Sequence, residues 1–403
     1  SPNSMLRLLP PVIGLSAILT SMFNAPDWLT YLKVRGSYTE VGNSYGRFMT
    51  TVTYPYDEQT QSWTSTSSYP NTKLKPERTK SWEVGLDARI LNDISLNLTY
   101  YRSNTYNQTF YADLSLSSGY SNIPIQSGNI MNEGLEMSLG YNKQWKDFSF
   151  NTNYTLTWNK NRVKRLADGV YNYATGQPIQ MPELSPLTYG HTDARLILRV
   201  GGSMGDVYGQ RLLKRDLNGY ILNEEGVGLA MENKETYLGS ILPKMNMGWS
   251  LGFGYKGVNL GMTFTGRFGG IVISETQSVL DAAGVSKVSA DVRDAGGVQI
   301  NQSKVSAQTY YQTIQGTAAY YTYSATNVRL GELSLSYTLP KKWFDNKVGM
   351  TVGLVGKNLW MIYCKAPFDP ELTTSAASNF YQGFDAYMLP STRNFGFNVK
   401  FQF

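Results

Sequence analysis

The last segment of the chain, residues 391–403, alternates strictly between apolar and polar side chains. The apolar positions are Phe395, Phe397, Val399, Phe401 and Phe403. The positions between them hold Asn394, Gly396, Asn398, Lys400 and Gln402. A period of two is typical of a strand with one apolar and one polar face. A soluble strand could have this pattern, but so could the strand that ends an outer-membrane barrel, with lipid on one side and the lumen on the other. In that interpretation Phe403 is the terminal signal of the barrel.

The same alternation recurs along the chain and predicts eleven strands. They are expected at about 5–20, 30–42, 82–90, 94–100, 135–141, 148–158, 245–253, 258–267, 328–337, 348–354 and 391–403. In the ninth strand the apolar phase slips by one residue, which predicts a β-bulge near Gly331 and Glu332. Strand lengths near 11–13 residues match a tilted crossing of a bilayer.

The connections between these strands alternate between short and long. Short turns are expected near residues 25, 92, 145, 255 and 343. Long loops are expected at 43–76, 105–128, 160–242, 270–326 and 359–390, with no regular structure assigned to them. Outer-membrane barrels have short periplasmic turns and long extracellular loops. In such barrels, girdles of aromatic residues lie at the two membrane–water interfaces, near the strand ends. The tryptophans at or near predicted strand ends are Trp28, Trp82, Trp145, Trp158, Trp343 and Trp360.

The predicted fold is therefore all-β, a transmembrane, antiparallel, up-and-down β-barrel. Bacterial barrels keep an even number of strands, so eleven strands predict a C-terminal part of a larger barrel whose earlier strands are missing. Twice eleven is 22, the size of barrels with a plugged lumen. The expected location is the bacterial outer membrane, with multiple crossings.

Composition agrees with this fold and excludes other classes. Tyrosine (29) and glycine (38) are numerous, whereas charged residues make up 16% of the chain, which suits β structure better than helical bundles. No run of 18 apolar residues is present, so no transmembrane helix is expected. The net charge of +6 is diffuse, which argues against nucleic-acid binding. Cys364 is the single cysteine and excludes an internal disulfide.

Several segments resemble the C-terminal half of SusC/RagA-type TonB-dependent outer-membrane transporters of Bacteroidetes. These segments are LKPERTKSWEVGLD (74–87), SGNIMNEGLEMSL (127–139), LPKMNMGWSLGFGYKGVNLGMTFTGRFGG (242–270), TNVRLGELSLSYTLP (326–340), GKNLW (356–360), FDPE (368–371) and PSTRNFGFNVKFQF (390–403). They span nearly the whole chain in the family's order. The whole chain, 1–403, is accordingly expected to be the C-terminal part of one barrel domain, without the plug and the first strands.

The resemblance implies active import of a bulky nutrient, either an oligosaccharide or an oligopeptide. It implies that TonB supplies the energy for import and contacts the N-terminal part that is missing here. It also implies that a SusD-like lipoprotein lies as a lid on the long loops. It also allows a dimer of transporter–lipoprotein pairs, surrounded by outer-membrane lipid. A passive porin or a secretion or structural barrel is the alternative. An enzyme is not expected.

Two groups of residues are candidates for contacts with a solute or partner. Aromatic residues in the predicted loops can stack on sugars or anchor an interface; they are Phe110, Tyr111, Tyr310, Tyr311, Tyr320, Tyr321, Tyr323, Phe380 and Tyr381. Packing of loop against loop is the competing explanation for them. Polar residues on the predicted lumen side can line the solute path or contact a plug; they are Asn151, Asn153, Thr155, Asn259, Thr263, Arg267, Asn394, Asn398 and Lys400.

No catalytic, metal or cofactor site is expected. His191 is the single histidine and is predicted to be an ordinary loop residue, because a triad or metal site needs ordered neighbours. Residues 216–219 (DLNG) resemble the start of a calcium loop, but the spacing to Glu224 and Glu225 favours a simple turn. Arg211, Lys214 and Arg215 form a small basic cluster, which is expected to be a solvated loop face; contact with anionic lipid A or a partner is the alternative.

Overall fold

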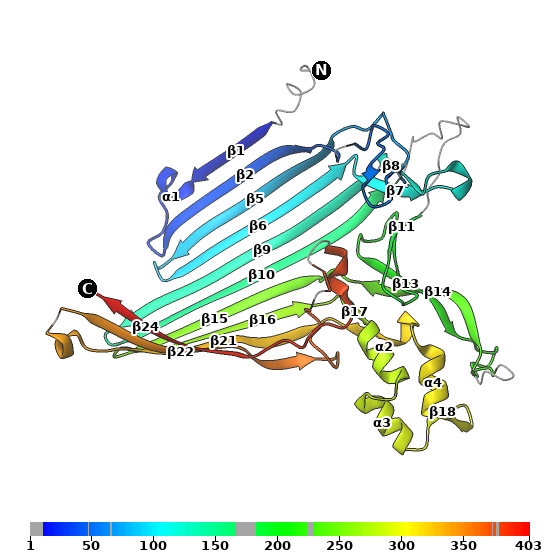
Figure 1. Cartoon of the computed structure of the whole chain (residues 1–403). Helices are drawn as coiled ribbons and strands as arrows, with labels where there is room; N and C mark the ends of the chain where they lie inside the picture. Colours follow the sequence, from blue (N-terminus) through cyan, green and yellow to red (C-terminus); the bar gives the residue numbers. More distant parts are fainter. Residues whose placement is uncertain are drawn as a thin grey trace.

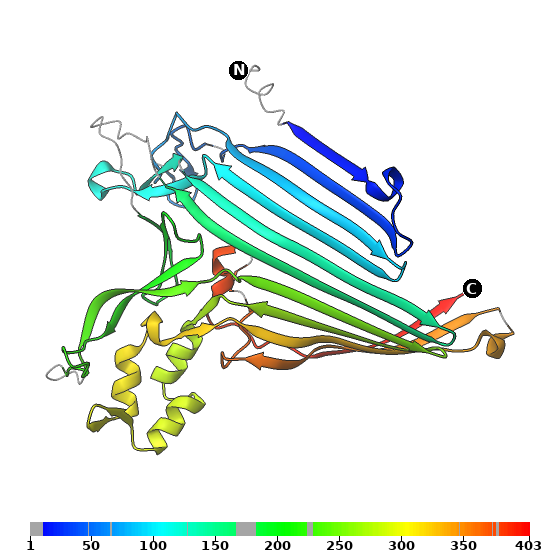
Figure 2. The same cartoon turned by 180° about the vertical axis from the view of Figure 1, so that it is seen from behind.

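In the computed structural model, eleven long strands form one antiparallel sheet that curves into an open trough (Figures 1 and 2). The structure describes residues 11–46, 48–64, 67–126, 128–166, 183–223, 229–345, 347–372, 374–375 and 379–403. In sheet order the strands are β1 (Val12–Ile18), β2 (Leu29–Asn43), β5 (Glu77–Ile90), β6 (Ile94–Tyr106), β9 (Asn129–Trp145), β10 (Phe148–Arg165), β15 (Met245–Tyr255), β16 (Val258–Phe268), β21 (Asn327–Thr338), β22 (Gly349–Cys364) and β24 (Asn394–Gln402). Strands that are neighbours in this order pair with each other, as predicted for an up-and-down barrel, and β1 and β24 form the two edges.

The pairing register keeps apolar side chains on one face across the whole sheet. Phe397 lies opposite Leu354, which lies opposite Leu335. The row continues through Leu260 to Phe253. One residue along, the row on the other face consists of Asn398, Gly353, Ser336, Asn259 and Gly254. A slip of one residue in any strand would exchange its two faces, so the alternation in the sequence fixes the register.

The outward face is exposed although it is apolar. The exposed fraction is 68% for Phe397, 60% for Leu354 and 44% for Trp249. Rings still pair across strands on this face, as do Phe150 and Phe253 with centroids 5.0 Å apart. An exposed apolar face that is continuous over eleven strands needs a nonpolar solvent, and a bilayer supplies one.

The short turns all lie at one end of the trough, as predicted. Between β15 and β16 the turn places Lys256 at φ 45° and Gly257 at φ 88°. Two residues with positive φ match the right-handed twist of a tight hairpin. The predicted bulge in β21 is also confirmed, because Phe264 pairs with Leu330 and Thr263 with Glu332, which leaves Gly331 without a partner in β16.

Strand boundaries differ from the prediction at the end that carries the long connections. β5 begins at Glu77 and β10 runs to Arg165, so Trp82 and Trp158 lie inside strands and not at their ends. The strands continue past these aromatics through polar residues, where apolar alternation gives no signal. The first strand ends earlier than expected, because β1 ends at Ile18 and the short helix α1 (Leu19–Met22) follows. The predicted start of this strand, residues 5–10, lies outside the described residues.

The long connections are folded, which corrects the prediction of loops without regular structure. A four-stranded sheet fills much of 183–240, with β11 (Glu183–Thr188), β12 (Arg195–Arg199), β13 (Asp206–Leu213) and β14 (Met231–Ser240). Three helices follow β17 (Ile271–Ser274); they are α2 (Glu275–Ala282), α3 (Lys287–Asp294) and α4 (Ala307–Ile314). Shorter strands are β3 (Tyr56–Asp57), β4 (Ser62–Trp63), β7 (Thr109–Asp113), β8 (Asn122–Gln126), β18 (Val298–Ile300), β19 (Ser303–Val305), β20 (Thr322–Ser324) and β23 (Phe384–Asp385).

Serine caps start all three of these helices. The side chains of Ser274, Ser286 and Ser306 each accept a hydrogen bond from a backbone amide three residues ahead. This bond satisfies an amide that has no partner within the helix. Among the described residues, no helix is long and apolar enough to cross a membrane.

Candidate functional site

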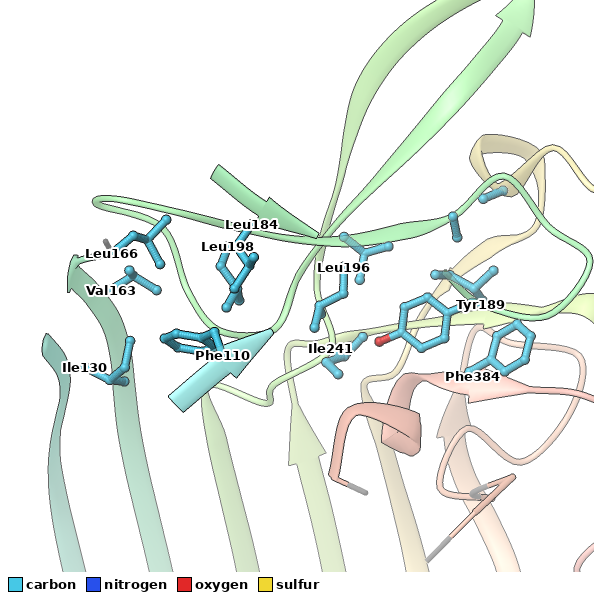
Figure 3. Packing of buried hydrophobic residues seen from close by; sticks show 14 of the residues in the cluster. Phe110, Ile130, Val163, Leu166, Leu184, Tyr189, Leu196, Leu198, Ile241 and Phe384 are labelled. Carbon is cyan, nitrogen blue, oxygen red and sulfur yellow. The ribbon is translucent and has the colours of Figure 1, made fainter. Parts of the chain in front are cut away.

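The candidate functional site is the group of folded connections at one end of the trough. It is called here the loop assembly and consists of the described residues within 109–126, 183–223, 229–242, 270–326, 364–372 and 379–390. The main hydrophobic core of the described residues lies here and not between the strands of the sheet. It joins Phe110 of β7 and Leu196 of β12 to Phe384 of β23 (Figure 3). Ile273 of β17 belongs to the same core. The long connections therefore pack on one another and form a compact layer over the end of the sheet.

A buried carboxylate ties three of these connections together. Glu275, the first residue of α2, is 3% exposed. Its Oε2 accepts a hydrogen bond from the backbone amide of His191 (3.4 Å), and its Oε1 accepts one from the hydroxyl of Tyr387 (3.3 Å). The neighbouring Ser274 donates to a carboxylate oxygen of Asp385 (2.6 Å). The connections before β12, at α2 and after β23 therefore meet at one polar centre.

A second buried carboxylate holds the β12–β13 region to the segment after α4. Oδ2 of Asp193 accepts hydrogen bonds from the amides of Gln210 (3.1 Å) and Arg211 (2.7 Å). Its Oδ1 accepts a hydrogen bond from the amide of Ala318 (2.6 Å). A carboxylate that accepts several backbone amides is a strong fixed joint between segments.

The candidate aromatic residues lie mainly inside the loop assembly. Phe110 belongs to the main core, and Tyr311 and Tyr321 belong to a second core of buried residues with Leu213 and Ile314. Burial raises the pKa of the Tyr321 phenol, with Asp281 as the next cause. These buried positions favour packing of loop on loop over contact with a solute.

The other aromatics are partly buried or exposed. Tyr310 packs edge-on against Tyr311 (5.2 Å), and the hydroxyl of Tyr320 accepts a hydrogen bond from the amide of Leu213 (3.1 Å). Tyr323 meets Phe368 edge-on (5.6 Å). Phe380 and Tyr381 pack against the main core, where Tyr189 donates to the carbonyl of Phe380 (2.7 Å). Tyr111 of β7 is 47% exposed and offers the most free ring area of the set.

The predicted lumen residues lie on the face of the sheet opposite the lipid-facing rows. The pairing register places these residues there: Asn151, Asn153, Thr155, Asn259, Thr263, Asn394, Asn398 and Lys400. Arg267 lies at the outer end of β16, and its guanidinium donates to the carbonyl of Ile241 (2.8 Å), which anchors the end of the β14 connection. Phe403 follows β24 and is 95% exposed.

His191 lies in the loop between β11 and β12 and contributes its backbone amide to the Glu275 centre. Asp216 begins a turn in which its side chain accepts the amides of Asn218 (2.9 Å) and Tyr220 (2.8 Å), as the turn interpretation predicted. Glu224 and Glu225 lie outside the described residues. Within the described part of the chain, no three His, Cys, Asp or Glu side chains are grouped closely enough to hold a metal ion.

Sequence reasoning missed Glu275 and Asp193. Neither residue stands in a motif, because each gains its role from backbone amides supplied by other segments. The one local signal was the serine cap that precedes Glu275 and marks the start of a helix.

Ten of the eleven sheet strands lie, in whole or in part, within the match to a known family. Residues 15–359 fit the family described as TonB dependent receptor-like, beta-barrel. The chain belongs to this family. This membership places the chain in the β-barrel of a bacterial outer-membrane protein.

Proteins with similar sequences to this chain agree with this assignment. TonB-dependent receptor P3 of Formosa agariphila is 26% identical over 410 residues, which is 93% of this chain and 40% of that protein. TonB-dependent receptor SusC of Bacteroides thetaiotaomicron is 27% identical over 154 residues, which is 38% of this chain and 14% of that protein. The chain thus spans less than half the length of these receptors.

A solved structure shares the fold. The RagAB peptide importer in its "open-open" state superposes with a TM-score of 0.67 at 20% identity, covering 97% of this chain and 42% of that one. In the "closed-closed" state the TM-score is 0.69 at 18% identity.

Proposed function

We propose that this chain is the C-terminal part of the barrel domain of an importer that works with TonB. The observation that carries the proposal is the family match over residues 15–359, which covers ten of the eleven sheet strands in whole or in part. The apolar outward face and the polar inward face support a barrel with a hydrated lumen. In this proposal the whole chain, 1–403, belongs to one barrel domain, and TonB acts through a part of the protein outside this chain.

The proposed cargo is a bulky nutrient, an oligosaccharide or an oligopeptide. RagAB is named a peptide importer, which supports the oligopeptide class. The oligosaccharide class rests on the resemblance of the sequence to SusC/RagA-type transporters. The loop assembly supports a large cargo, because a compact polar and aromatic layer at the mouth of the barrel offers a broad surface for it. The exposed ring of Tyr111 is the leading candidate for stacking on the solute.

The proposed partner is a SusD-like surface lipoprotein that lies over the loop assembly. The fixed joints at Glu275 and Asp193 support this role, since a lid needs a firm platform. Two such transporter–lipoprotein pairs joined as a dimer are part of the same proposal.

The test is native mass spectrometry of the intact protein that carries this chain, extracted from its own outer membrane. We expect a lipidated second polypeptide to remain bound, with a ladder of ligand masses spaced by sugar or amino-acid residues. A barrel that emerges alone and empty, and that conducts ions in a planar bilayer without TonB, would replace the importer with a passive pore.

A further inference from the structure

Basic residues gather at the outer end of the lipid-facing side of the sheet. On three strands a basic residue follows an aromatic one by two positions toward the loop assembly. The pairs are Trp82 and Lys80 in β5, Tyr100 and Arg102 in β6, and Trp158 and Lys160 in β10. Residues two apart on a strand share a face and are separated by about 7 Å. Arg78 and Arg162 continue the series by two more positions on β5 and β10.

The register brings these residues into one sector of the sheet. Trp82 pairs with Arg102, and Arg102 pairs with Glu133. Glu133 in turn pairs with Lys160. We call the five cations the outer basic patch; they are Arg78, Lys80, Arg102, Lys160 and Arg162. The patch lies just beyond exposed aromatics, at the level where the headgroups of the outer leaflet begin.

The patch has more positive than negative charge. The carboxylate of Glu40 forms ion pairs with two of the cations, Arg78 at 3.1 Å and Lys80 at 4.0 Å. Glu133 is the second carboxylate on this face, so two acids face five bases. Within the described part of the chain, the side chains of Arg102, Lys160 and Arg162 form no ion pair and no hydrogen bond. Three cations are therefore available for an external anion.

A hollow of about 530 Å³ adjoins the patch at β10. Lys160 and Arg162 line it together with Lys244. Asp206 also lines it, but its carboxylate already accepts hydrogen bonds from the hydroxyl of Tyr237 (3.2 Å) and the amide of Ser203 (2.8 Å). The volume fits a sugar-sized group better than a bare phosphate.

The patch is confined to one side of the trough. In the row of Trp158, the outward positions on the next two strands are Met245 of β15 and Phe268 of β16. A general attraction to headgroups would not require cations concentrated between β5 and β10. Cations concentrated beside a hollow suit the binding of a single molecule.

We propose that the outer basic patch and the adjoining hollow bind the phosphorylated sugar headgroup of an outer-leaflet lipid. The phosphate would lie among Arg102, Lys160 and Arg162, because guanidinium and ammonium groups make strong charge-assisted bonds to phosphate oxygens. The acyl chains would run down the apolar outward face below the aromatics. This inference rests on the location in the outer membrane and is independent of the imported cargo.

The test uses the intact protein in detergent micelles and counts bound lipid by native mass spectrometry. The probes are purified lipid A with its phosphates and the same lipid A after enzymatic dephosphorylation. The variant replaces three cations of the patch (R102Q, K160Q, R162Q). The matched control removes three charges at the opposite end of the barrel (K256Q, K341Q, K342Q).

We expect phosphorylated lipid A to bind the wild type and the control equally, and to bind the patch variant at least about tenfold more weakly. Dephosphorylated lipid A should bind the wild type as weakly as phosphorylated lipid A binds the patch variant. Equal binding of the two lipid forms to the wild type would overturn the proposal without reference to any variant. Undiminished binding to the folded patch variant would overturn it as well.

Discussion

At the scale of single residues, the side of the sheet on which a residue lies decides what a substitution costs. Phe397 and Asn398 are neighbours in β24, yet Phe397 belongs to the apolar row of Leu354 and Asn398 belongs to the polar row of Gly353. Both are solvent-exposed in the isolated trough, so burial alone does not separate them. The membrane does, because it surrounds one row and not the other.

Replacing Phe397 with Lys should therefore destabilise the barrel by roughly 2–4 kcal/mol if the residue lies near the bilayer midplane. The measurement is the free energy of unfolding of the intact protein in lipid vesicles. Asn398→Lys is the matched control, with little change expected because its side chain meets water in the lumen. Equal effects of the two substitutions would show that the faces are assigned wrongly.

A second residue-scale prediction concerns Glu275. Glu275→Gln preserves the shape but removes the charge that holds the amide of His191 and the hydroxyl of Tyr387. Weakening charge-assisted bonds at a buried site should cost about 1–3 kcal/mol, confined to the loop assembly. Hydrogen exchange at the amides of α2 and of residues 189–193 should become faster, while the strands of the sheet keep their protection.

The control for this change is Asp291→Asn, which removes an acid from an exposed i, i+4 pair with Lys287 on α3. Such a pair contributes little, so exchange should not change. If hydrogen exchange is also unchanged in the Glu275 variant, the hydrogen bonds of Glu275 do not hold these connections together.

At the scale of elements, the strands could be predicted from the sequence and the loop assembly could not. A strand in a barrel wall meets lipid on one side and water on the other. Its apolar residues, which face lipid, therefore alternate with polar residues, which face water. The loop elements are short and pack on several neighbours at once. Leu196 and Leu198, for example, lie on β12 with Ile197 between them, and all three are buried, so no alternation appears.

The same reasoning explains which parts of the candidate site were accessible to sequence analysis. The lumen residues follow directly from strand alternation, as with Asn259 and Thr263 on β16. The buried state of Tyr311 and Tyr321 depends on contacts between α4, β13 and the segment before β20, which are distant in sequence. The folded structure of the connections is needed to tell which aromatic residues are buried and which, such as Tyr111, are exposed.

The loop assembly should open at alkaline pH before the sheet does. Burial, followed by Asp281 and Tyr311, raises the pKa of Tyr323 to about 12 from an ordinary value near 10. A raised pKa in the folded state means that the neutral phenol contributes stability below pH 10, and that this stability is lost as the pH rises from 10 to 12. Tyrosinate absorbance and near-ultraviolet dichroism should change together in this range, while the strand signal persists.

Tyr323→Phe serves as the control, since it keeps the ring against Phe368 and removes the ionisable group. The alkaline transition should then shift to higher pH. A transition that stays at the same pH in this variant, or one that unfolds the sheet at the same time, would contradict this assignment.

At the scale of the whole molecule, the described sheet has two open edges. β1 pairs only with β2, and β24 pairs only with β22. Open edges with free backbone groups are not stable within a bilayer, where every such group needs a partner. The chain spans about 40% of the length of TonB-dependent receptor P3. The rest of the barrel wall is therefore expected to come from strands outside this chain, which the prediction of a 22-stranded barrel requires.

The most direct test of the central claim is a spin-label scan along β15 (Met245–Tyr255) in the intact protein reconstituted in lipid vesicles. Cys364 is first replaced with Ser, and each position in turn then carries one label. We expect collision with oxygen to peak at the odd positions, such as Met247, Trp249 and Leu251. Collision with a water-soluble nickel chelate should peak at the even positions. Accessibility that varies without a period of two would contradict a membrane-spanning barrel wall.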